Sequence, residues 1–506
     1  MSFDDDLTAL RASGATDAER LGELARASLA EQREDEVLPL LAAAARKGRD
    51  ARLWQWKGLL ERALDEHAEA VESFRQASAL APGDASIAHG AARVALEAGL
   101  PAVNLFIRAL QLAPADAQVY LGLNAARIAE GRSEEAEADL DQVLVRSPLW
   151  LDGHQQLAQI RALIGKRHLA FASLDRAIAS NAAATPLWQT LCELQVLGDE
   201  FELLKETLRR ARQAGVQGPA LAAYDFIAAS ELGETARADE LLASGEAAAG
   251  PIWSVRHFMR NGELDQASAI VDAELTGGRP TDILPYAQSL WRLTGDPRLD
   301  WLAGPESLVS VIDLGDELAA IRGLAERLRT LHDASGRYLD QSVRGGSQTD
   351  GPLFSRIEPE IRALRALIVK AVQQHTAGLQ SLPDGHPQKL NATGRKIRFT
   401  GSWSVRLMGQ GFHTSHVHPQ GWISSALYVS LPEQLDEGEG WLTLGDPPAE
   451  LGLQLPPSRM VEPKVGRLVL FPSWMFHGTR PFRAGERLTV AFDVAPPAEG
   501  QSSSSS

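Results

Sequence analysis

Up to about residue 305, the apolar residues of this chain recur with the spacing of helices that bury one face. Short interruptions containing Gly or Pro separate these helical patterns. After about residue 385 the pattern changes to short alternating runs between Gly and Pro residues, which predicts antiparallel strands. The pattern therefore divides the chain into a helical part followed by a strand-rich part.

Within the helical part, one pattern of small and large residues recurs at intervals of about 34 residues. Its clearest copy consists of Trp54, Gly58, Ala70, Phe74, Ala77 and Pro82. The Pro returns at Pro114 and Pro148, and the pattern weakens beyond residue 185. It resembles the tetratricopeptide repeat (TPR), whose stacked helix pairs form a superhelix with a concave groove. We expect a helical N-terminal cap over residues 1–50 and a TPR-like solenoid over residues 51–305.

Six runs in the C-terminal part have a strand pattern: Lys396–Thr400, Ser402–Met408, Ile423–Leu431, Gly440–Leu444, Arg467–Phe471 and Arg487–Val494. Residues 311–380 have a helical pattern with a Gly-rich interruption at SVRGGSQTDGPLF. Helices followed by closely spaced antiparallel strands suggest a jelly-roll or cupin-like domain with supporting helices, which we expect over residues 310–498. The predicted class is an α+β multidomain protein, and the Ser-rich end at 499–506 predicts a disordered tail.

Composition and charge narrow the class of protein. The 506 residues are 44% hydrophobic and 23% charged, which is ordinary for a globular protein. The net charge of −16 argues against a nucleic-acid partner, and no apolar run is long enough to predict a membrane span. The single cysteine, Cys192, precludes an internal disulfide, and the acidic start has no pattern of a secretory signal. We expect a cytoplasmic protein, whose oligomeric state the sequence does not set.

The candidate chemistry lies in the strand-rich part. His413, His416 and His418 lie close together, and His477 follows a later strand. Residues i and i+2 of an extended segment face the same side, so His416 and His418 can direct their imidazoles to one point. A closed barrel can bring His477 beside them. Three such ligands leave half an octahedron open, as in non-heme Fe(II) oxygenases; the alternative is that these histidines only cap loops.

Arg487 opens a strand ten residues after His477, and Thr489 lies on the same face of that strand. A guanidinium beside a hydroxyl, near a metal, can hold the far carboxylate of a dicarboxylate. The alternative is an ordinary surface charge.

These segments together resemble the 2-oxoglutarate/Fe(II)-dependent dioxygenases, in particular a bacterial subfamily of oxygenases. The resemblance rests on the strand at Trp403, HVHP at His416–Pro419, SSALYV, DPP at Asp446–Pro448, and FPSWMFHGTRPF before ERLTVAFD. It implies a double-stranded β-helix in which His416, His418 and His477 bind Fe(II). It also implies that Arg487, assisted by Thr489, holds 2-oxoglutarate, and that O2 is the second cosubstrate. Tyr428 either donates a hydrogen bond to the cosubstrate or packs inside the barrel.

One position departs from the wider family, which has a carboxylate where this chain has His418. A neutral imidazole there raises the net charge at the metal by one unit. A three-His site is also similar to that of the thiol dioxygenases, which use no 2-oxoglutarate, but Arg487 favours the cosubstrate. His413 and Asp446 remain alternative members of the site.

The reaction implied by the resemblance is hydroxylation coupled to the oxidative decarboxylation of 2-oxoglutarate to succinate, with no separate general base. The layout is similar to that of the aspartyl/asparaginyl β-hydroxylases and prolyl 3-hydroxylases, which act on polypeptides. We therefore expect a protein or peptide substrate in the solenoid groove, and the acidic charge favours a basic one. Two alternatives remain open: an oxygenase of a small metabolite whose solenoid serves assembly, and a catalytically inactive interaction scaffold.

Overall fold

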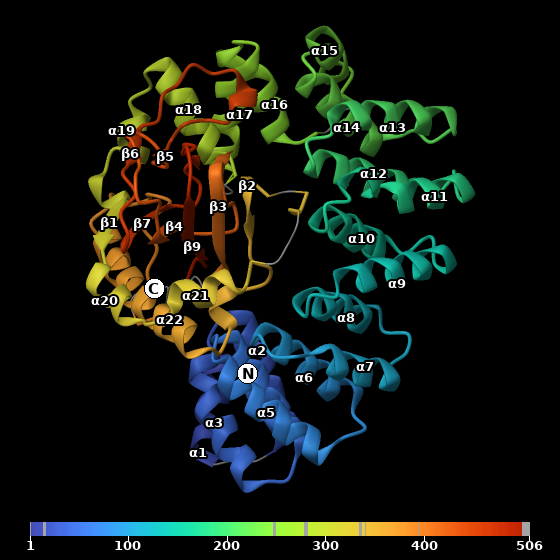
Figure 1. The fold of residues 1–506 in the computed structure, drawn as a ribbon, viewed down its shortest axis with the longest axis vertical. Coiled ribbons are helices and arrows are strands. Elements are labelled where there is room, and N and C mark those ends of the chain that lie inside the picture. The colour runs from blue at the N-terminus through green and yellow to red at the C-terminus, as the bar shows by residue number, and fades with distance from the viewer. Residues whose placement is uncertain are drawn as a thin grey trace.

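The computed structural model describes residues 2–13, 17–245, 249–277, 282–332, 336–339, 341–392 and 394–497. A helical arch curves around one side of a strand-rich domain (Figure 1). The predicted fold class is confirmed, because helical repeats lead into a curled antiparallel sheet with supporting helices. The predicted tail at 499–506 lies outside the described residues. No helix in the described ranges is long and apolar enough to cross a membrane.

The arch begins with three helices, α1 (Phe3–Ser13), α2 (Ala18–Glu31) and α3 (Glu34–Lys47). Helix pairs follow: α4 (Ala51–Ala63) and α5 (His67–Leu80), α6 (Ala85–Glu97) and α7 (Val103–Leu112), α8 (Ala117–Ala129) and α9 (Ser133–Arg146), α10 (Leu151–Leu163) and α11 (Ala172–Ser180), α12 (Thr185–Leu197) and α13 (Phe201–Gln213), α14 (Pro219–Glu231) and α15 (Thr235–Ala243), α16 (Pro251–Arg260) and α17 (Leu264–Thr276). It ends with α18 (Leu284–Thr294) and α19 (Arg298–Ala303). The first helices of the pairs start every 32 or 34 residues, so the repeat continues past residue 185, where the sequence pattern weakens.

The small and large positions of the repeat pack against one another. Phe74 is buried between Gly58 of its own repeat and Gly90 of the next. A Cβ at Gly58 would lie 2.8 Å from the ring of Phe74, and one at Gly90 would lie 2.3 Å from it. Phe106 stands in the same relation to Gly122. Each aromatic ring therefore needs a glycine on the facing helix, which explains why these residue types recur together.

The strands form one curled sheet in the order β1-β7-β4-β9-β3-β8-β5-β6, with β2 also paired to β3. Their bounds are β1 (Ser310–Asp313), β2 (Val343–Gln348), β3 (Phe399–His416), β4 (Ile423–Ser430), β5 (Leu442–Leu444), β6 (Arg459–Val461), β7 (Arg467–Pro472), β8 (His477–Thr479) and β9 (Glu486–Val494). Helices α20 (Gly315–Ala320), α21 (Leu324–Arg329) and α22 (Pro359–Leu379) support it. The expectation that residues 311–380 are helical was therefore incomplete, because β1 and β2 lie at or within this region.

Strand β3 changes partner along its length, and this change curls the sheet. Its first half pairs with β9 and its last residues pair with β8. Between the halves, Gln410 has φ +69° and donates its backbone N–H to the Phe482 carbonyl, 2.6 Å away. A Cβ on the flanking Gly411 would meet the Met408 carbonyl at 2.7 Å. The glycine-rich kink lets one strand serve both halves of the barrel.

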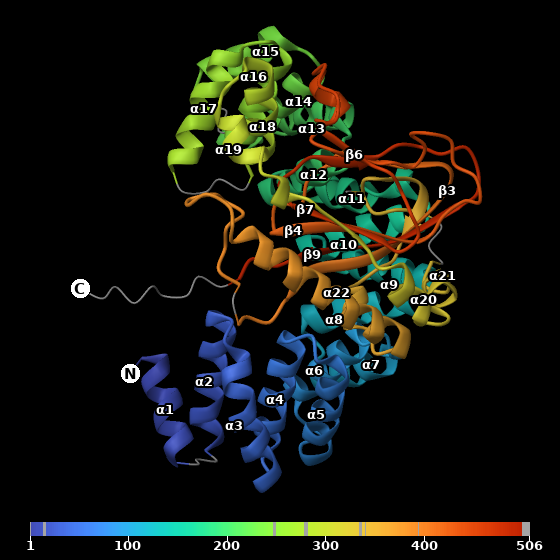
Figure 2. The same cartoon turned by 90° about the vertical axis from the view of Figure 1, so that its left-hand side faces the viewer.

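The N-terminal end of the arch lies beside the strand-rich domain (Figure 2), and ion pairs connect the two. Arg398 pairs with Glu34 and donates to the Gln32 carbonyl, and Lys396 pairs with Glu66. Glu34 is almost fully buried. A buried carboxylate in this setting depends on its partner, so these contacts fix the first repeats against the sheet.

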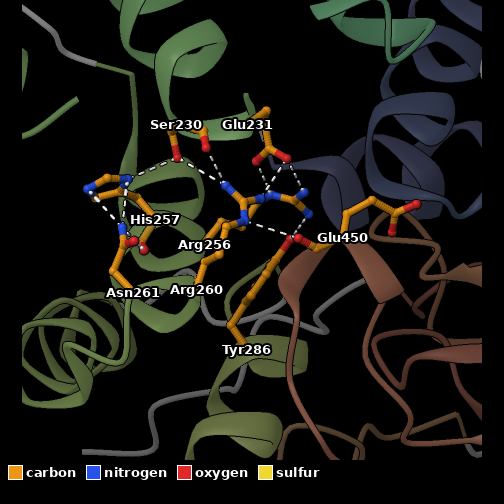
Figure 3. Close-up of polar contacts among 8 residues, drawn as sticks. All are labelled: Ser230, Glu231, Arg256, His257, Arg260, Asn261, Tyr286 and Glu450. Carbon is orange, nitrogen blue, oxygen red and sulfur yellow. Dashed lines mark hydrogen bonds and ion pairs between the residues drawn. The ribbon is translucent and has the colours of Figure 1, made fainter. Parts of the chain in front are cut away.

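The other end of the arch is tied down by an arginine network (Figure 3). Glu231, with a side chain 2% exposed, receives hydrogen bonds from Arg256 and Arg260. Arg260 also donates to the backbone carbonyl of Glu450, in the strand-rich domain, at 3.0 Å. Both ends of the arch therefore rest on the domain that it encloses.

A hydrophobic core also crosses from the arch into the sheet. Every residue of α18 from Leu284 to Trp291 is buried. Most of them, including Leu284 and Trp291, share one core cluster with Leu442, Phe471 and Phe476. The predicted boundary between residues 305 and 310 falls between α19 and β1 and stays a prediction, but the core itself does not stop there.

His375 of α22 supplies a test of stability against pH. Its Nδ1 lies 2.7 Å from the Ser310 hydroxyl, and burial lowers its pKa to about 4. The unfolded chain binds a proton near pH 6.5 and the folded chain does not, so the free energy of unfolding should fall as the pH drops from about 6.5 to about 4. This residue alone should contribute on the order of 3 kcal/mol. Urea unfolding at several pH values should show a weaker pH dependence for His375→Gln than for the wild type; equal slopes would contradict the argument.

Candidate active site

Three histidines converge at one end of the barrel. His416, the last residue of β3, is paired across the sheet with His477, the first residue of β8. His418 follows in the loop after β3, where its backbone N–H donates to the Ser473 carbonyl. One ring nitrogen from each lies within 4.8 Å of the others, and this is the one group of three metal-ligating side chains found in the described ranges. The bend in β3 and the cross-strand pairing with β8 together create this arrangement.

Hydrogen bonds fix the orientation of each ring. The Nδ1 atoms of His416 and His477 lie 2.7 and 3.0 Å from the backbone carbonyls of Thr414 and Met475. The Nδ1 atom of His418 lies 2.6 Å from the Asp493 carboxylate. Because each acceptor needs a proton from Nδ1, the lone pair of each ring is on Nε2. At His416 the Ser342 hydroxyl lies 3.3 Å from that atom.

Burial keeps two of the rings neutral. It lowers the pKa of His416 to about 3, with a further contribution from His418. It also lowers the pKa of His477 well below its ordinary value, helped by His416 and His418. Neutral imidazole is the form that binds metal, so the two rings are ready to ligate an ion without losing a proton.

The histidines line a cavity of about 660 Å³. Strand β9 contributes Arg487, Thr489, Ala491 and Asp493 to its wall. These alternate residues share one face of the strand. The volume falls in the ordinary range for small-molecule sites and exceeds what one dicarboxylate of about ten heavy atoms would fill, which leaves room for part of a second molecule.

Arg487 lies at the end of this wall opposite Asp493. It is 3% exposed, and its Nε and Nη1 atoms are buried with no hydrogen-bond partner among the described residues. Burial lowers the pKa of its guanidinium. The guanidinium carbon lies 5.0 Å from the centre of the Tyr428 ring. A buried cation with unused donors is unfavourable by itself, so the pocket suits an anionic ligand.

The other residues singled out in the sequence have these places. Thr489 lines the cavity, whereas the fully buried Tyr428 packs against Arg487 and does not line it. His413 lines the cavity and stacks on His416 at 6.1 Å, but is outside the three-nitrogen group. Asp446 does not line the cavity; its buried Oδ1 has no partner among the described residues, and burial raises its pKa.

Sequence reasoning missed Asp493. It stands six residues after Arg487, so it has the same strand parity as Arg487 and Thr489. That parity was the available signal, but the contact with His418 depends on how β3, β4 and β9 lie side by side.

Comparison with known proteins agrees with this geometry. Residues 401–493 match the family model described as "Putative 2OG-Fe(II) oxygenase". Over these residues, the strand-rich part is similar to the oxygenase domains of this family. Helical repeats in front of it give the chain a TPR plus 2OG-Fe(II) oxygenase architecture. The match includes all three histidines and Arg487. No curated protein matches the chain.

Several solved structures of TPR proteins are similar to the helical part. MamA from Desulfovibrio magneticus is 19% identical, with 33% of this chain and 96% of that chain covered and a TM-score of 0.29. YrrB, described as a TPR protein with an unusual peptide-binding site, is 17% identical, with 37% and 97% covered and a TM-score of 0.29. A tetratricopeptide repeat protein from Parabacteroides merdae is 17% identical, with 45% and 92% covered and a TM-score of 0.29.

Proposed function

We propose that this protein is an Fe(II)- and 2-oxoglutarate-dependent dioxygenase that hydroxylates a protein or peptide. One observation carries the proposal: Arg487, whose Nε and Nη1 atoms have no hydrogen-bond partner among the described residues, lines the same cavity as the three histidines. A three-nitrogen metal site alone would fit many activities. A metal site that shares a cavity with a buried arginine fits a cosubstrate that has one carboxylate for the metal and a second carboxylate for the arginine.

The residues present fit both groups. The three Nε2 lone pairs would hold the iron, and the open cavity beside them leaves positions for other ligands. When bound, iron would supply the redox chemistry that couples the decarboxylation of 2-oxoglutarate with O2 to oxidation of the substrate.

The chain's own contribution is binding and orientation. Arg487 binds the C5 carboxylate of 2-oxoglutarate through its free donors, and Thr489 lies beside it on the same wall. The ring of Tyr428 packs against the guanidinium and does not line the cavity. Leu442 and Phe471 give this cavity an apolar wall, which limits the entry of water.

A second cavity supports a peptide substrate. It encloses about 510 Å³ and is lined by residues of the arch, from α6, α8, α9 and α10, and by residues of the oxygenase domain. Gln348 of β2 lines this cavity and also the one that holds the histidines. The second cavity is also lined by the acidic residues Glu130, Glu134 and Asp350. The charge of its lining cation, Arg356, is balanced by an ion pair with Glu358. An extended basic segment lying along the arch suits this charge and would come close to the metal site.

The first experiment is the anaerobic addition of Fe(II) and then 2-oxoglutarate to the full chain. We expect the visible absorption band of an iron-chelated keto acid, followed by succinate formation once O2 is admitted. Iron binding without the band would indicate a three-His oxygenase that uses no 2-oxoglutarate. No iron binding would leave an interaction scaffold.

The peptide proposal predicts a charge effect at Glu134. Glu134→Lys should weaken the binding of Lys- and Arg-rich peptides about 3- to 10-fold at low salt, and less at high salt. Fluorescence anisotropy with a labelled basic peptide library measures this. Glu202→Lys is the matched control, because Glu202 occupies the same place in the first turn of α13 as Glu134 does in α9, yet lines neither cavity. Equal losses of peptide affinity in the two variants would mean that the effect comes from net charge alone. An enzyme that acts on a small metabolite would bind no peptide at all.

A further inference from the structure

The carboxylate of Asp493 lies directly behind one metal-ligand candidate. Its Oδ2 is 2.6 Å from Nδ1 of His418, and its side chain is 9% exposed. His416 and His477 have backbone carbonyls in the corresponding position. Asp493 is therefore the one carboxylate hydrogen-bonded to any of the three rings among the described residues.

Neighbouring hydroxyls hold this carboxylate in place. The Ser424 hydroxyl donates to Asp493 Oδ1 at 2.6 Å. The hydroxyl oxygens of Ser424 and Ser473 lie 2.9 Å apart, so Ser473 can donate in turn to Ser424. Ser424 also faces Asp493 across the β4–β9 pairing. The two oxygens of Asp493 thus have separate partners, one for orientation and one for His418.

The charge balance of the site gives this contact its importance. Three neutral imidazoles bring no negative charge to a dication, whereas oxygenases with two histidines and one carboxylate bring one. Of the two acids that line the cavity, Asp282 is exposed and Asp493 is buried behind His418. A carboxylate behind a metal-bound histidine raises the basicity of that ligand and fixes its orientation.

We propose that Asp493 is a positioning residue that supplies, through His418, the negative charge that a carboxylate ligand would otherwise bring to the metal. This inference rests on the proposed metal site. Strand β9 then provides both buried charges of the pocket, since Arg487 faces the cosubstrate and Asp493 balances the metal on the same side of one strand.

A double-mutant cycle on the metal-binding constant tests the proposal. Asp493→Asn should weaken the binding of Co(II) or Zn(II) to the full chain about 10- to 100-fold, measured by competition with a chromophoric chelator. In the His418→Asp background, where the metal gains a carboxylate of its own, the same change should leave binding unchanged or tighter. A merely structural role for Asp493 predicts the same loss in both backgrounds and would overturn the proposal.

Two controls complete the test. Ser424→Ala removes a hydrogen bond from Asp493 but keeps its charge, so its affinity for Co(II) should stay within about 3-fold of the wild type. If Asp493→Asn does not fold, nitrogen NMR of histidine-labelled, Zn(II)-loaded wild type decides the question: His418 must bind through Nε2 and keep its Nδ1 proton, and binding through Nδ1 would refute the inference. A wild type that binds no metal overturns the proposed function too, whereas a wild type and Asp493→Asn that bind equally overturn this inference alone.

Discussion

Replacing Arg487 with Met should abolish 2-oxoglutarate binding and, at the same time, make the ligand-free protein more stable. The guanidinium is buried with two unused nitrogen donors, so it is unfavourable until an anion arrives. Loss of its charge-assisted hydrogen bonds should weaken the affinity for 2-oxoglutarate by about 100-fold or more. An apolar side chain of similar length removes the buried charge, which should raise the thermal midpoint of the ligand-free chain by a few degrees.

The two effects of Arg487→Met have opposite signs, and this makes the prediction specific. The absorption band of the Fe(II)–2-oxoglutarate complex measures the first, and thermal unfolding without ligands measures the second. Arg483→Met is the matched control, because Arg483 is 68% exposed in its side chain just before the same strand. It should change neither quantity. A stable Arg487→Met variant that keeps the band would rule out Arg487 as the cosubstrate anchor.

Replacing His477 with Ala should weaken the affinity for the metal more than about 100-fold, since one of three ligands is lost and two imidazoles remain. His477 is buried and paired directly with His416 across β3 and β8. Metal content after dialysis and the absorption spectrum of bound Co(II) both measure the loss.

His413→Ala provides the comparison for His477→Ala. His413 lies in the same cavity and stacks on His416, yet it is outside the three-nitrogen group. We expect this variant to retain the metal within about 10-fold of the wild type. Equal losses of metal affinity in the two variants would mean that His413 is a ligand. The ligand set His416, His418 and His477 would then be wrong.

Local patterns were enough to predict the repeats and the candidate histidines. The pairing of Phe74 with glycines follows from small and large residues at fixed spacing, which a sequence displays directly. The grouping of Arg487 with Thr489 follows from strand parity. The roles of His416, His418, His477, Arg487, Thr489 and Tyr428 stay predictions until binding is measured.

Contacts between distant segments could not be predicted. The short strand β8, which begins at His477, is defined by its pairing with the bent end of β3 and has little pattern of its own. Strand β2 is rich in Gly and polar residues, so it shows no alternating pattern. The bond between His418 and Asp493 joins residues 75 positions apart. The contact of the arch with the strand-rich domain includes single ion pairs such as Arg398–Glu34, which no periodicity reveals.

Because α18 and the sheet share one hydrophobic core, the helical arch and the strand-rich domain are not two independent modules. A cut between residues 305 and 310 would expose the apolar face that Leu284–Trp291 buries against the sheet, including Phe471, whose ring lies 4.8 Å from that of His477. We therefore expect the last repeat and the strand-rich domain to unfold as one cooperative unit. Transferring the proposed activity to another scaffold would require the final repeat to move with the strand-rich domain.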